Sequence, residues 1–152
     1  MAVAELFKGL VYTTIGLLLF TVMMTFGATV AGYFELRAAA EAAAWSAQSQ
    51  IQQEVVNSSG VQGYFTTTLQ TVGDPVQAAQ QQFEASAQSE HLSNLFDNLQ
   101  ENAIVNNEEV TVTVSGTFHV PWIQEATQAI FGGAFTTDFQ VPMTVSVTGG
   151  SA

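Results

Sequence analysis

The pattern of apolar and polar positions divides the chain into a long helical first part and a mixed remainder. From Gly9 to Phe34, 26 consecutive residues carry no formal charge, and as a helix they would extend about 39 Å at 1.5 Å per residue. This length exceeds the roughly 30 Å hydrocarbon core of a bilayer, so the segment is long enough to span a membrane. The threonines within it are compatible with a helix, because a threonine hydroxyl can bond to the carbonyl one turn earlier.

The helical pattern continues beyond the apolar run. Residues 35–56 contain no Gly or Pro and are rich in Ala, Gln, Glu and Leu, which are good helix formers. Ser58, Ser59 and Gly60 then favour a stop. We therefore predict one helix over residues 1–57, apolar in its first half and amphipathic in its second. The face expected to lie on a globular domain consists of Leu36, Ala40, Ala43, Ala44, Ala47, Ile51 and Val55.

Residues 58–152 are expected to form a globular head. Asp74 followed by Pro75 is typical of a helix N-cap and first turn. The apolar spacing that follows predicts a helix over about 75–102, and a kink or short break near His91 is the alternative. Residues 61–71 fit a loop, a short helix or an extended segment equally well.

Near Glu108 the spacing of apolar residues changes from the helical pattern to every second residue. Val110, Val112 and Val114 alternate with threonines, which predicts a half-buried strand over about 108–120. A second strand is expected over about 134–148, where Pro142 indicates an edge position or a bulge. The segment between them fits a short helix or a long turn ended by two glycines, Gly132 and Gly133. The predicted fold class is therefore α+β, with a long N-terminal helix and a head that holds a further helix and a small antiparallel sheet.

Composition narrows the partners of this fold. Two Lys and Arg residues stand against 13 Asp and Glu, and the net charge of −11 disfavours direct binding to nucleic acid. The chain has no cysteine, so disulfides, thiolate metal sites, a cysteine nucleophile and covalent c-type haem are excluded. Low charge density leaves a neutral polar surface that tolerates close packing against copies of the chain.

Candidate chemistry is sparse. His91 and His119 are the only histidines, and neither has the spacing of a metal or catalytic motif, so we interpret His91 as solvated and His119 as structural. Carboxylate pairs such as Asp97 with Glu101 can attract a divalent cation, but no ligand spacing supports a site. No nucleotide-binding or nucleophile motif occurs. We therefore predict no catalytic residue, no metal and no cofactor, and an enzyme is the least favoured class.

The two tryptophans have alternative roles. Trp45 is expected to pack from the alanine-rich helix. Trp122 is expected to pack in the core, with an exposed adhesion contact as the alternative.

The order of these segments resembles a type IV pilin after removal of its leader peptide. The resemblance rests on "MAVAE", the apolar run, the alanine-rich helix and the small sheet. Within that family the runs "YFELRAAAEAAAWSA", "VTVTVSGTFHVPW" and "FTTDFQVPMTVSVTG" are most similar to the tight-adherence (Tad, TadE-like) branch. The resemblance implies a structural subunit that is first anchored in the cytoplasmic membrane and then incorporated, by a pilus assembly machinery, into a cell-surface filament of identical subunits for adhesion or motility.

The resemblance also implies roles for individual residues. Glu5 would pair with the N-terminal amine of Met1 in a neighbouring subunit, and Met1 is either an initiator methionine or the first residue left by cleavage. Lys8, one turn from Glu5 on the same helix, is the local alternative partner. Residues expected to pack in the filament core are Leu6, Leu10, Gly16, Leu17, Phe20, Met24, Gly27 and Gly32.

Two other interpretations stay open at this stage. The chain fits a membrane-anchored minor pilin or pseudopilin, or a single-pass anchored extracellular binding domain. A cleaved secretory signal is disfavoured because its apolar core spans only about 7–15 residues. The position of Lys8 before the apolar run places the N-terminus in the cytoplasm and the head outside.

Overall fold

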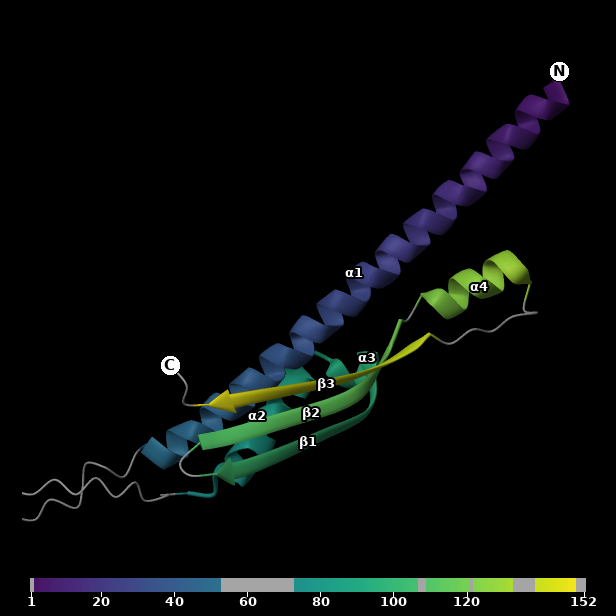
Figure 1. The fold of residues 1–152 in the computed structure, drawn as a ribbon. Helices are drawn as coiled ribbons and strands as arrows, with labels where there is room; N and C mark the ends of the chain where they lie inside the picture. The colour runs from purple at the N-terminus through teal and green to yellow at the C-terminus, as the bar shows by residue number, and fades with distance from the viewer. Residues whose placement is uncertain (1, 53–72, 107–108, 121, 133–138, 150–152) are drawn as a thin grey trace, which may run out of the picture.

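The computed structural model describes residues 2–52, 73–106, 109–120, 122–132 and 139–149. It has the α+β fold that the sequence predicts, with a long N-terminal helix beside a three-stranded antiparallel sheet (Figure 1). The elements in chain order are α1 (Ala2–Gln52), α2 (Pro75–Ser89), α3 (Leu92–Leu95), β1 (Phe96–Asn106), β2 (Glu109–His119), α4 (Ile123–Phe131) and β3 (Gln140–Gly149).

Helix α1 is continuous over its 51 residues, as predicted, and residues 53–57 of the predicted helix lie outside the described part. Its N-terminal half projects away from the sheet, whereas its C-terminal half lies along it (Figure 1). All five threonines of the apolar run donate to the carbonyl four residues earlier at 2.7–2.8 Å, as expected, and they are Thr13, Thr14, Thr21, Thr25 and Thr29.

The head core lies between the sheet and two helices. Strand β2 is central, with β1 and β3 antiparallel on its two sides. Alternate residues of β2 are buried against α1, which also contacts α2 and β3. The predicted face of α1 is confirmed from Leu36 to Ile51, and Val55 lies outside the described residues. Buried members of this face are Leu36, Ala40, Ala43, Ala44, Ala47 and Ile51.

Helix α2 starts as predicted. Asp74 is its N-cap, and the Asp74 carboxylate accepts hydrogen bonds from the amides of Val76 and Gln77 at 3.0 and 3.2 Å. Proline occupies the first turn, where no amide hydrogen is needed.

The prediction of one helix over 75–102 is wrong beyond Ser89. The chain turns at His91, whose φ of 53° is left-handed, and a four-residue helix α3 leads directly into β1. The break near His91 is therefore the correct alternative. The pairing of β1 with β2 shifts in register between Asp97 and Gln100, where Asn98 also has a left-handed φ of 53°. This irregularity places both Phe96 and Leu99 on the inner side of the sheet, so the apolar residues of β1 are three apart, as in a helix.

The other two predicted strands are present as β2 and β3, although β3 begins later than predicted, at Gln140. Strand β3 is at the edge of the sheet, and Pro142 is exposed there opposite Thr117, which confirms the edge position. Residues 134–138 of the predicted strand lie outside the described part. Between β2 and β3 the short-helix alternative is correct: α4 ends at Phe131 and Gly132 is its C-cap, whose left-handed φ of 61° favours glycine.

Candidate functional site

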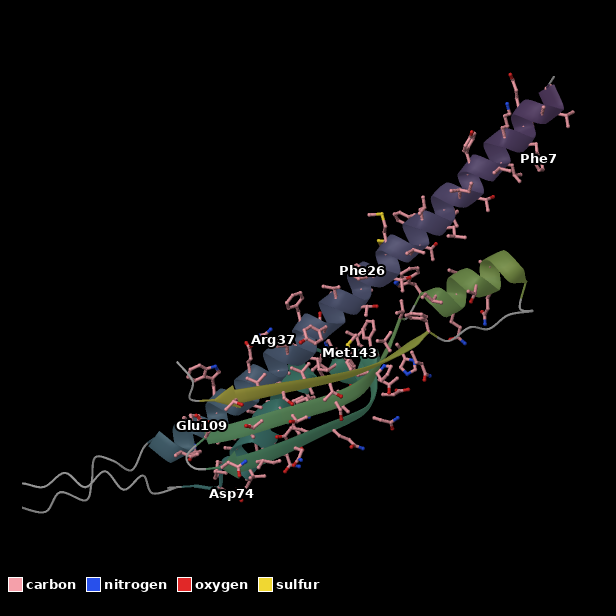
Figure 2. All side chains as sticks on the ribbon, viewed as in Figure 1. Phe7, Phe26, Arg37, Asp74, Glu109 and Met143 are labelled. Atoms are coloured by element: carbon pink, nitrogen blue, oxygen red, sulfur yellow. The ribbon has the colours of Figure 1, made fainter. Side chains whose placement is uncertain are left out.

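The main unexplained feature of the molecule is the apolar surface of α1. We call the exposed side chains of residues 2–34 the α1 apolar surface; its large members include Leu6 (74% exposed), Phe7 (68%) and Met23 (74%). Figure 2 shows side chains, Phe7 and Phe26 among them, projecting from the part of α1 that extends beyond the sheet. Soluble monomers rarely expose contiguous apolar patches beyond about 300–600 Å². By its length and composition the helix could also cross a membrane.

Seven of the predicted filament-core residues belong to this surface. Large apolar side chains are exposed at five positions, and no atom lies within 4 Å of a Cβ placed at Gly16 or Gly27. They are therefore available to another helix, although the structure of one chain does not bring them together. The five exposed side chains are Leu6, Leu10, Leu17, Phe20 and Met24.

Gly32 has a different environment from the one predicted. It is buried, and a Cβ placed there would lie only 2.6 Å from Cε2 of Phe118. The Phe118 ring comes from β2, so Gly32 permits α1 to pack against the head of its own chain. Within one chain the missing side chain of Gly32 therefore serves the fold of the subunit, and its packing between subunits stays a prediction.

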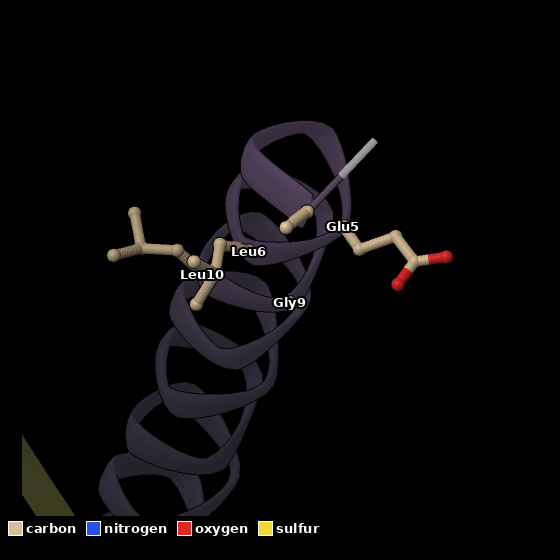
Figure 3. Close-up of a pocket in the computed structure, with 5 residues that line it drawn as sticks. Glu5, Leu6, Gly9 and Leu10 are labelled. Carbon is tan, nitrogen blue, oxygen red and sulfur yellow. The ribbon is translucent and has the colours of Figure 1, made fainter.

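Glu5 and Lys8 are both exposed near the free end of α1. Figure 3 shows the Glu5 carboxylate pointing away from the helix, on the opposite side from Leu10. Beside it lies an open concavity of about 590 Å³ lined by Ala2, Glu5, Leu6, Gly9 and Leu10. Within the described residues Glu5 and Lys8 form no ion pair, so the local alternative is not formed. Met1 lies outside the described residues.

A groove between α1 and α4 was not predicted. We call it the α1–α4 groove; it comprises two adjoining cavities of about 410 and 460 Å³. Ile123 lines both cavities, and Ala126 and Thr127 line the first. The apolar residues of "PWIQEATQAIF" at positions three apart could have indicated an amphipathic helix, but no local signal shows which surface it faces. Groove residues on α1 are Thr13, Thr14, Leu17, Leu18, Thr21, Val22, Thr25, Phe26 and Thr29.

The titratable residues of the head differ in their surroundings. His119 Nε2 pairs with Asp97 Oδ2 across β1 and β2, and His91 is exposed at the start of α3. Burial raises the pKa of Glu101, and the nearby negative charge of Glu84 raises this pKa further. Among the described residues no group of three His, Asp or Glu side chains is arranged to hold a metal ion.

The tryptophans differ in environment. Trp122 packs against the core, as expected, whereas Trp45 is 62% exposed, so its predicted packing role is wrong. The head covers only one side of α1, so the other side of the helix, including Trp45, remains exposed.

No protein-family model, curated protein or solved structure matches the chain. The functional argument therefore rests on the α1 apolar surface, the charges at its free end and the sequence pattern.

Proposed function

We propose that this chain is the structural subunit of an extracellular, type IV pilus-like helical filament of the tight-adherence kind. It polymerises through α1 and serves surface adhesion or motility. The observation that carries the proposal is the contrast along one continuous helix. The C-terminal half of α1 buries one face against the head, whereas residues 2–20 are exposed throughout.

The α1 apolar surface has two successive environments in this proposal. Lipid surrounds it while the subunit is anchored in the cytoplasmic membrane, and the same surface of other copies surrounds it after the assembly machinery has incorporated the subunit. Helix association without a hydrophobic driving force depends on close packing and small residues. Gly16 and Gly27, which have open space around them, permit that close approach.

Glu5 would form an ion pair between neighbouring subunits of the filament. A carboxylate transferred into an apolar bundle is costly unless a cation pairs with it, and removal of one partner of a buried ion pair costs about 3–5 kcal/mol. Glu5 is not paired with Lys8 in the described residues. This leaves Glu5 available to the amine of Met1 in a neighbouring subunit.

Microscopy of material sheared from the surface of cells that produce the chain, followed by mass spectrometry, tests the proposal. We expect abundant filaments made of this one protein. Trace incorporation would instead support the minor-pilin alternative, and recovery from membranes alone would support an anchored binding domain. Both alternatives share the helix that can cross a membrane.

A substitution tests the role of Glu5. Glu5→Gln should reduce the filament yield at least tenfold, because each factor of ten corresponds to about 1.4 kcal/mol and a buried amine left without its partner costs more than this. Glu41→Gln is the matched control, since Glu41 forms an exposed ion pair with Arg37 on the same helix. A filament yield of the Glu5→Gln variant equal to that of the wild type would refute the ion pair between subunits.

A further inference from the structure

We propose that the α1–α4 groove holds the apolar helix, residues 9–34, of a second copy of this chain in the assembled filament. The inference rests on the proposed filament and names a contact within it. It gives α4 a function in assembly, in addition to the contacts that α1 helices make with one another.

The groove is long enough for a helix to lie along it. Its α1 wall runs from Thr13 to Thr29, a length of about 24 Å at 1.5 Å per residue. Helix α4 provides the other wall near its first two turns, and Phe139 and Val141 extend this wall at the start of β3. In Figure 1 α4 extends from the head beside the free part of α1.

The lining chemistry selects an apolar occupant. No charged residue lines either cavity. Every threonine in the lining already donates its hydroxyl to a carbonyl of its own helix: the five on α1 do so four residues back, and Thr127 bonds to the carbonyl of Ile123. A polar ligand would therefore find few free donors, whereas an apolar helix would bury the threonine methyl groups and the surrounding leucine and valine side chains.

The opposite face of α4 is suited to water. Gln124, Glu125 and Gln128 are exposed, so α4 is polar on the outside and apolar towards α1. This arrangement fits a helix at the boundary between an apolar filament core and solvent.

The level of α4 along α1 argues against lipid as the occupant. Only residues 2–12 of α1 lie beyond the groove, about 17 Å of helix, which is short of the roughly 30 Å hydrocarbon core. With α1 embedded in a bilayer, α4 in this position would carry Glu125 into hydrocarbon, at a cost of a few kcal/mol or more. The described arrangement therefore fits a state in which protein surrounds α1, and the uncharged helix that each copy supplies is residues 9–34.

Disulfide formation between two single-cysteine chains tests the contact, because the chain has no cysteine of its own. One chain carries Ala126→Cys, in the groove wall, and a co-expressed chain carries one cysteine scanned through residues 9–34. Each chain has one thiol, so any disulfide joins two copies and runs at twice the 16.2 kDa chain mass, and a different affinity tag on each chain identifies the dimers that contain both. The matched control replaces Ala126→Cys with Gln128→Cys, about 160° around α4.

In filaments verified by microscopy, we expect Ala126→Cys to form dimers with scanned positions three or four residues apart. Their yield should be at least about tenfold above the Gln128→Cys control, because proximity raises the effective thiol concentration. Intact filaments without that excess would overturn the inference and leave the proposed function standing; lipid or another part of the same chain would then fill the groove. Absence of filaments from the unsubstituted chain would overturn both.

Discussion

The replacement of Gly32 by alanine distinguishes a residue of the head core from a residue of the filament interface. A Cβ at this position would lie 2.6 Å from Cε2 and 2.9 Å from Cδ2 of Phe118, closer than the 3.0 Å that Cβ contacts respect. The Phe118 ring is 2% exposed and packs against Phe96 with ring centroids 5.2 Å apart. The ring therefore has little room to move, and α1 must shift from β2.

The expected size of the effect comes from two opposing contributions. Overpacking a well-packed core costs about 1–3 kcal/mol, whereas replacing glycine by alanine within a helix contributes up to about 1 kcal/mol of stability. Gly27→Ala is the matched control, because nothing lies within 4 Å of its Cβ position. The free energy of unfolding should thus be about 1–3 kcal/mol lower for Gly32→Ala than for Gly27→Ala.

Thermal unfolding of the full chain in detergent, followed by near-ultraviolet circular dichroism, measures this difference. Each 1 kcal/mol corresponds to a shift in Tm of about 4–8 °C for a domain of 60–100 residues. Phe118→Leu in the Gly32→Ala background should recover part of the loss, because the smaller side chain leaves room for the new methyl group. Equal Tm values for the two alanine variants, with filament assembly lost only in Gly32→Ala, would refute the reasoning and return Gly32 to the subunit interface.

Two further substitutions probe the head. Gln48→Ala should lower the free energy of unfolding by about 1–3 kcal/mol, because the side-chain carbonyl of the buried Gln48 accepts a hydrogen bond from the amide of Val110 at 3.3 Å. Ser49→Ala, on the exposed side of α1, is the control. Equal losses of stability for the two variants in urea unfolding would contradict this prediction. Glu101→Gln should stabilise the head at neutral pH by less than about 1 kcal/mol, after allowance for solvent screening. Burial raises the folded-state pKa of Glu101 above the ordinary 4.5, so folding is favoured below 4.5 and this advantage is lost as the pH rises through the folded-state pKa. A Tm difference between Glu101→Gln and wild type that is independent of pH would contradict the assignment.

The sequence predicts the parts of this fold that local patterns determine. The long helix, its buried alanine face, the cap at Asp74 and the alternation in β2 each follow from periodicity or capping chemistry that neighbouring residues supply. Strand β1 was missed because its apolar residues have helical spacing. The register shift after Asp97 and the left-handed Asn98 produce that spacing, and neither has a local sequence signal as strong as Gly or Pro.

Tertiary placement accounts for the remaining differences at the candidate site. The three glycines Gly16, Gly27 and Gly32 are equivalent in a sequence pattern, yet only Gly32 meets a side chain of the head. Likewise, the amphipathic character of α4 is visible in the sequence, but its position beside Thr13–Thr29 depends on where β2 ends and β3 begins. Such contacts join residues about 100 positions apart, so no local window contains both partners.

The distribution of charge leads to a prediction about the polymer as a whole. Glu5 and Lys8 cancel, and every other charged residue lies at position 35 or later, so the net charge of −11 belongs to the second half of α1 and the head. Neighbouring heads in a filament would repel one another while the uncharged helices associate. Raising the ionic strength from about 0.01 M to 0.15 M shortens the Debye length from about 30 to 8 Å, which weakens this repulsion and leaves apolar packing in place. Filaments should therefore dissociate at a higher temperature in the higher salt, as measured by light scattering. A lower dissociation temperature in salt would show that exposed ion pairs, and not the α1 apolar surface, hold the subunits together.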